Sequence, residues 1–133
     1  MRRALVAALL LAACATPVGA ERSGCGAEWQ DAEAVAAVPP GTEEQSLPIE
    51  CMHQIANRRV RVGFVLPAGP SCHVLSRVGL VESADAVSIT LFGAVDDDPN
   101  VGACLDEGRM VVTEIDVAAP IDDRVLLDGS GAE

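Results

Sequence analysis

Lysine and tyrosine are absent from this sequence, and aromatic side chains are scarce. All nine basic residues are arginine, and 20 acidic residues oppose them, so the formal net charge is −11 over 133 residues. The aromatic residues are Trp29, Phe64 and Phe92. Nucleic-acid binding depends on a dense basic surface and often on aromatic stacking. We therefore predict no nucleic-acid partner.

Long hydrophobic runs are also missing. The longest, Ala4 to Ala15, is too short to span a bilayer. It follows the cationic start Met1-Arg2-Arg3 and precedes small residues, which is the pattern of an export signal. We predict that residues 1–20 carry an export signal and take no part in the fold.

Two cleavage sites compete in this segment. Leu11-Ala12-Ala13-Cys14 resembles a bacterial lipobox, in which the cysteine is acylated, whereas Val18-Gly19-Ala20 resembles an ordinary signal-peptidase site. We favour lipidation of Cys14, because cysteine is uncommon at the end of such a segment. Either cleavage leaves seven arginines against 20 acids, a net charge of −13. We therefore expect a protein that is secreted, or held at the outer face of the cytoplasmic membrane by its lipid alone.

Four cysteines remain after cleavage: Cys25, Cys51, Cys72 and Cys104. An even number in an oxidising compartment indicates disulfides, and three pairings are open. We favour Cys25–Cys51 with Cys72–Cys104, because a hairpin around residues 83–85 would bring Cys72 beside the loop that holds Cys104. The sequence has no C-x-x-C, the spacing of thioredoxin-like redox sites and zinc ribbons.

Apolar and polar residues alternate from residue 58 onward, with the period of two that is typical of half-buried strands. Gly79 is expected to mark a bulge. The expected strands are Val60–Leu66, Cys72–Glu82, Val87–Leu91, Val111–Val117 and Val125–Leu127. The sequence shows no βαβ alternation. We therefore predict a mainly β domain over residues 58–129, built as a small antiparallel meander or sandwich of four to five strands. Residues 130–133 are expected to form a tail.

Residues 21–57 lack a clear pattern. Ala27 to Val38 is rich in alanine and acidic residues, which predicts a short helix with Trp29 on its apolar side. Thr42 to Glu50 is expected to form a loop. A flexible tether between the lipid and the domain is the alternative for the whole segment, and the sequence leaves both open.

An acidic stretch is the first candidate metal site. Four side chains with oxygen atoms stand at positions 1, 3, 5 and 12 of a calcium-loop spacing: Asp96, Asp98, Asn100 and Glu107. Val101 occupies the position where the bend needs glycine, and the flanking segments are predicted strands rather than helices. We therefore predict a solvated acidic loop without a metal.

Two Cys–His pairs are the second candidate. Cys51 and His53 together with Cys72 and His73 could bind zinc or copper if the thiols were reduced. Disulfide formation would remove the thiolates, so we predict no metal and no other cofactor. The two histidines stand in no recognisable nucleophile motif, and we predict no enzymatic activity.

One charged turn is expected to be structural. In Asp122-Asp123-Arg124, an aspartate of the turn is placed to pair with the arginine that follows it. Such an ion pair contributes little to stability when it is exposed.

The stretch from Val60 to Ser130 resembles an uncharacterised domain of small exported lipoproteins from high-GC Gram-positive bacteria. The resemblance rests on Cys72, Cys104, the Val87–Leu91 strand and the ending Ala119-Pro120-Ile121-Asp122-Asp123-Arg124-Val125-Leu126-Leu127-Asp128-Gly129. The family tends to carry Leu-Gly where this chain has Ile121-Asp122. The resemblance implies an envelope location and a disulfide-pinned β domain, and it implies no activity.

These observations predict a non-catalytic interaction module. Its expected partner is an envelope or extracellular protein, and its contact with a membrane is through a lipid anchor. Two alternatives stay open: a calcium- or transition-metal-binding envelope protein and, third, a small secreted hydrolase.

Overall fold

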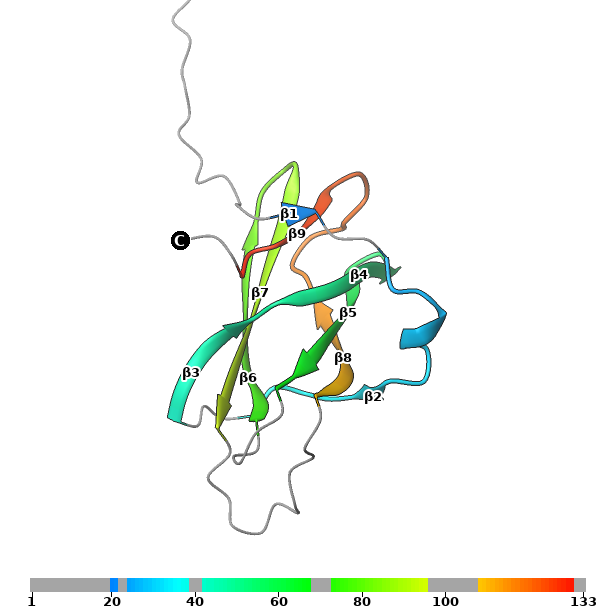
Figure 1. Cartoon of the computed structure of the whole chain (residues 1–133). Coiled ribbons are helices and arrows are strands. Elements are labelled where there is room, and N and C mark those ends of the chain that lie inside the picture. The colour runs from blue at the N-terminus through cyan, green and yellow to red at the C-terminus, as the bar shows by residue number, and fades with distance from the viewer. Residues whose placement is uncertain (1–19, 22–23, 39–41, 68–72, 96–107, 131–133) are drawn as a thin grey trace, which may run out of the picture.

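The computed structural model describes residues 20–21, 24–38, 42–67, 73–95 and 108–130, and within these ranges the chain forms nine strands in two sheets. The sheets pack against each other around a shared core (Figure 1). The predicted mainly β fold is confirmed, but the described residues form nine strands rather than the expected four to five. The arrangement corresponds to the sandwich rather than to a single meander, because hairpin neighbours and distant segments both contribute strands to each sheet.

The first sheet is built around β7. Its strands are β1 (Ala20–Glu21), β3 (Thr42–Leu47), β6 (His73–Glu82), β7 (Ala86–Val95) and β9 (Val125–Asp128). β6 pairs antiparallel with β7 along one edge. β3 and β9 share the other edge of β7, and β1 pairs with β9. Ala20, which was expected to take no part in the fold, is therefore part of this sheet.

The second sheet has the order β2-β8-β5-β4. Its strands are β2 (Glu33–Ala34), β4 (Ile49–Ala56), β5 (Arg59–Leu66) and β8 (Arg109–Asp116). Pro48 alone separates β3 from β4, so one nearly continuous run leaves the first sheet and enters the second (Figure 1). The buried Asp128 carboxylate fixes this corner, because its Oδ2 accepts a hydrogen bond from Ile49 N at 3.1 Å.

The core lies between the sheets and takes alternate residues from their strands. Its fully buried members include Val60, Val62 and Phe64 of β5 and Val87, Ile89 and Leu91 of β7. Burial of one face of each strand is the reason that a period of two was predictive. A smaller cluster of Trp29, Cys51 and Val112 covers the outer face of the second sheet.

The N-terminal segment differs from the expected helix. Residues 27–38 form a single 3-10 turn, η1 (Ala27–Trp29), followed by β2. The predicted Cys25–Cys51 disulfide is present and fastens this segment to β4. Val35 N also donates a hydrogen bond to Val112 O of β8 at 2.8 Å. These long-range attachments outweigh the weak preference of a short isolated sequence for a helix.

The expected loop over residues 42–50 is wrong, because this stretch forms β3 and the start of β4. The expected boundary at residue 58 falls inside the β4–β5 hairpin, where Gln54 pairs with Val60. The described part of residues 21–57 supplies strands to both sheets. It is therefore an integral part of the domain and not a tether.

The bulge in β6 lies at Ser76 and not at Gly79. The register shifts between Leu75 and Arg77, whereas Gly79 pairs with Thr90 in a regular ladder. Ser76 Oγ donates a hydrogen bond of 2.7 Å to Glu44 of β3. That bond gives the extra residue of the bulge a partner across the sheet.

Candidate functional site

Two strand edges face each other on the side of the sandwich opposite the β3–β4 corner. Among the described residues, β6 has a strand partner on one edge only, namely β7. β8 pairs with β5 on one edge, and on the other edge β2 pairs with it only at Val111 and Val112. We call the gap between β6 and β8 the slot.

Residues 35–38, which we call the strap, close one end of the slot. Val35 N donates to Val112 O of β8 at 2.8 Å, and Val38 N donates to Leu75 O of β6 at 3.0 Å. The strap thereby bridges the two sheets at the beginning of both strands.

The clamp, formed by Glu82 and Arg124, closes the other end. Glu82 Oε2 accepts a hydrogen bond from Ala118 N at 3.0 Å, and Glu82 Oε1 accepts one from Arg124 Nη1 at 3.1 Å. The Ala118 N–H and the Arg124 guanidinium hold the pKa of the Glu82 carboxyl below its usual value, although partial burial opposes this. The carboxylate is therefore ionised at neutral pH.

The predicted pairing of Arg124 with an aspartate of its own turn is wrong. Asp122 and Asp123 are exposed, and Asp122 adopts a left-handed backbone conformation with φ 46°. Arg124 turns inward instead, where its Nη2 also donates to Ala119 O at 2.7 Å. Asp122 and Asp123 of this turn are therefore exposed to solvent, whereas Arg124 binds Glu82 in the clamp.

The slot is a groove of about 590 Å³ with mainly apolar walls. Its lining consists of Ala34, Val35, Ala36, Ala37, Val78, Leu80, Thr113, Glu114 and Ile115. Leu80 lies on the core side of β6, since its cross-strand partner Ile89 is fully buried. Leu80 is nevertheless 37% exposed, against 0% for Ile89. The interior of the sandwich is therefore open to solvent along this edge.

The slot carries negative charge. Among the described residues that line it, Glu114 is the one that is charged, and its side chain is 46% exposed. Arg59 Nη1 lies 3.8 Å from Glu114 Oε2, and Arg59 Nε also forms an ion pair with Asp116 Oδ1 at 2.9 Å. Arg59 is thus shared between two carboxylates and does not neutralise Glu114 fully.

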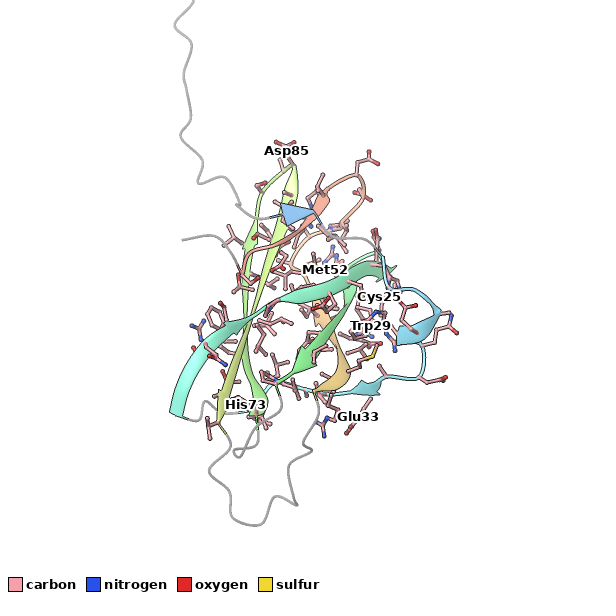
Figure 2. All side chains as sticks on the ribbon, in the orientation of Figure 1. Cys25, Trp29, Glu33, Met52, His73 and Asp85 are labelled. Carbon is pink, nitrogen blue, oxygen red and sulfur yellow. A yellow bond between two sulfur atoms is a disulfide. The ribbon has the colours of Figure 1, made fainter. Side chains whose placement is uncertain are left out.

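The Cys–His metal candidates are not brought together. Cys51 is bonded to Cys25 and has no free thiolate. His53 belongs to β4 of the second sheet and His73 to the start of β6 in the first, and Figure 2 shows His73 well away from Cys25. Across the described ranges, no group of three or more His, Cys, Asp or Glu side chains is arranged to hold a metal ion.

Several predicted residues lie outside the described residues. They are Cys14, Cys72, Cys104, Asp96, Asp98, Asn100 and Glu107. Lipidation, the second disulfide and the solvated acidic loop therefore stay predictions.

Sequence reasoning missed the slot. The alternation of Val78 and Leu80 with Arg77 and Val81 identifies the inward face of β6, but it does not indicate whether a strand covers the edge. That depends on which distant strands pair, and β3 takes the opposite edge of β7.

Comparison of the chain with known protein families, with curated proteins and with solved structures finds no match. Within the described part of the chain, no helix is long and apolar enough to cross a membrane.

Proposed function

We propose that this protein is a non-catalytic binding module of the cell envelope that takes an extended polypeptide segment into the slot. The observation that carries the proposal is Leu80, a core-side residue that is 37% exposed between two strand edges. A strand edge presents backbone N–H and C=O groups that another chain can pair with. Addition of an extended segment to such an edge is a common mode of peptide recognition.

The walls of the slot favour a particular segment. Val35, Val78 and Ile115 offer apolar contacts to the inward side chains of an inserted strand, and alternate residues of a strand point to opposite faces. Glu114 and the overall charge of −11 favour cationic side chains near the ends of the segment. A second copy of this chain would carry the same negative charge, so the proposed occupant is a basic segment of a different protein.

The envelope location is part of the proposal. An export-type N-terminus with Cys14 supports it. The Cys25–Cys51 disulfide is consistent with an oxidising compartment.

The absence of lysine offers a direct test. The probe is a synthetic peptide of about eight alternating valine and threonine residues, close to the usual strand length, flanked by lysines or, as the matched control, by glutamates. Carbodiimide coupling joins peptide lysines to carboxylates of the protein, which has no lysine side chain for self-coupling. We expect the cationic peptide to couple at Glu114. Titration calorimetry compares the affinities of the two peptides, because the anionic peptide has no lysine to couple, and we expect it not to bind.

Two variants of β6 separate the slot from the rest of the strand. L80Q alters the slot wall, whereas V81Q changes a more exposed side chain on the opposite face of the same strand. We expect L80Q to weaken peptide binding about tenfold, since it replaces apolar contact with an amide, and V81Q to leave binding unchanged. Equal affinity of both peptides, or unchanged affinity in L80Q, would overturn the proposal.

A further inference from the structure

A second pocket lies beside the disulfide on the outer face of the second sheet. It has a volume of about 170 Å³ and is lined by Cys25, Gly26, Trp29, Gln30, His53 and Arg61. Figure 2 shows Cys25 and Trp29 close together beside the sheet. Among the described residues, the lining combines an indole ring, a disulfide, an amide, an imidazole and a guanidinium and contains no carboxylate.

The fold assembles this pocket from three segments. Gly63 of β5 leaves room for the Trp29 ring and the Cys51 sulfur, because a Cβ at Gly63 would lie 2.7 Å from Trp29 Cε3 and 2.5 Å from Cys51 Sγ. His53 and Arg61 are cross-strand neighbours on β4 and β5, so their side chains extend from the same face of the sheet. One wall is therefore apolar and the other is polar and cationic.

Arg61 is a cation without an ion pair among the described residues. The cross-strand neighbour of Arg61 on β8 is Glu114. Glu114 does not pair with Arg61, because its Oε2 lies 3.8 Å from Arg59 Nη1. His53 Nδ1 is also buried without a hydrogen-bond partner in the described part of the chain. A half-buried arginine that faces a cavity and pairs with none of the acidic residues that the structure describes can bind an external anion.

We propose that this pocket binds a small carboxylic acid with one flat ring. The guanidinium presents a fork of donors that matches a carboxylate, and the Trp29 ring offers an apolar face against which a ring can pack. The volume of about 170 Å³ suits a ligand of one ring, since a cavity of about 150 Å³ holds benzene. The inference rests on residues outside the slot and does not depend on the proposed function.

Benzoate is the probe, and the single tryptophan is the reporter. With excitation that selects tryptophan, the signal comes from Trp29 alone, because the chain has no tyrosine and no other tryptophan. We expect saturable binding in the millimolar range, about 1 mM. Acetate lacks the ring, inorganic phosphate lacks both the ring and the planar carboxylate, and benzyl alcohol lacks the charge, so each should bind more weakly than benzoate.

Three variants test the assignment of the cation. R61Q should weaken benzoate binding about tenfold by removal of the charge-assisted hydrogen bonds. R77Q is the control and should not, because the Arg77 guanidinium lies 3.6 Å from the centroid of the Phe92 ring on the first sheet, away from the pocket. E28Q should strengthen binding, because the Glu28 carboxylate lies beside Gly26 of the lining, with Oε2 only 2.6 Å from the position of a Cβ at Gly26. Circular dichroism checks that each variant is folded.

The proposal fails in any of three cases. The first is that wild-type protein shows no saturable fluorescence response up to about 20 mM benzoate. The second is that R61Q binds benzoate as tightly as wild type, and the third is that phosphate binds more tightly than benzoate. Peptide coupling in the slot is measured separately, so failure of one proposal leaves the other standing.

Discussion

Arg124 and Glu82 form an ion pair with a nitrogen–oxygen distance of 3.1 Å, and this pair joins the β6–β7 turn to the connection between β8 and β9. The Arg124 side chain is only 9% exposed and that of Glu82 is 21% exposed. Removal of one partner of such a pair leaves a largely buried charge without compensation. The clamp therefore holds together two loops that are 42 residues apart in the sequence.

The first prediction concerns the clamp itself. E82Q should lower the free energy of unfolding by about 2–3 kcal/mol, somewhat less than the value for a fully buried pair because Glu82 is partly exposed. Urea denaturation followed by Trp29 fluorescence measures the change. D123N, at the aspartate next to Arg124, is the control and should stay within about 0.5 kcal/mol of wild type. A loss in E82Q no larger than in D123N would contradict the role of the clamp.

The second prediction concerns pH. The pKa of Glu82 is lowered from 4.5, chiefly by the Ala118 N–H, and the pKa of Glu44 is lowered from 4.5, chiefly by the Ser76 hydroxyl. A carboxyl with a lowered pKa in the folded state adds stability above its unfolded pKa, and this stability is lost as the pH falls through the folded value. We expect the urea concentration at the midpoint of unfolding to decrease as the pH is lowered below about 4.5. This decrease with pH should be shallower in E82Q than in wild type. The same dependence of the urea midpoint on pH in both proteins would contradict the contribution of Glu82.

The third prediction compares two glycines in the middle of strands. A Cβ at Gly63 would lie 2.5 Å from Cys51 Sγ and 2.7 Å from Trp29 Cε3, whereas a Cβ at Gly79 would lie 3.4 Å from Phe92. G63A should cost about 1–3 kcal/mol through overpacking. G79A should be neutral or stabilising by up to about 1 kcal/mol, since glycine weakens a strand interior. Thermal unfolding of both variants decides this, and equal effects would contradict the packing of Trp29.

The fourth prediction concerns the Cys25–Cys51 disulfide, whose cysteines are 26 residues apart. The double variant C25A/C51A should lose about 3 kcal/mol on the loop-entropy estimate. Trp29 emission should rise, because the ring packs beside the Cys51 sulfur and a neighbouring disulfide quenches indole fluorescence. The variant is preferable to a reductant, which would also act on the predicted Cys72–Cys104 bond. Unchanged Trp29 emission in the double variant would contradict the contact between the Trp29 ring and the Cys51 sulfur.

The fifth prediction concerns the remaining cysteines. Intact mass before and after reduction should report two disulfides, Cys25–Cys51 and Cys72–Cys104, and no free thiol. In protein isolated from an exporting bacterium, the same measurement should reveal an acylated Cys14 at the N-terminus. Free thiols at Cys72 and Cys104 would revive a metal site at His73 as a candidate.

Periodicity alone placed most strands after residue 58. The alternation of Val60, Val62 and Phe64 predicted β5, and similar patterns predicted β7, β8 and β9 to within a few residues. These strands have one face in the core and one outside, so hydropathy alternates directly with burial. Cysteine number and compartment predicted disulfides, and the Cys25–Cys51 pairing was favoured because the hairpin around residues 83–85 was expected to bring Cys72 beside the loop that holds Cys104.

The strand β3 shows why the N-terminal half was harder to predict. Its sequence TEEQSL ends in a single buried residue, Leu47, and shows no apolar alternation. It becomes a strand because the free edge of β7 accepts it and because Glu44 reaches Ser76 and Arg77 of β6, with Arg77 Nε at 2.7 Å. Partners more than 30 residues away cannot be read from a local pattern.

The local sequence pattern is thus sufficient to predict the class of fold, because the alternation of apolar and polar residues along a strand predicts which side chains are buried. The slot and the Arg61 pocket arise differently. Leu80 is exposed because no strand of the described ranges covers that edge of β6, and Arg61 faces a cavity because Gly63 lets Trp29 pack against the second sheet. Both features depend on which distant segments meet, and that outcome is set by the packing of the whole chain.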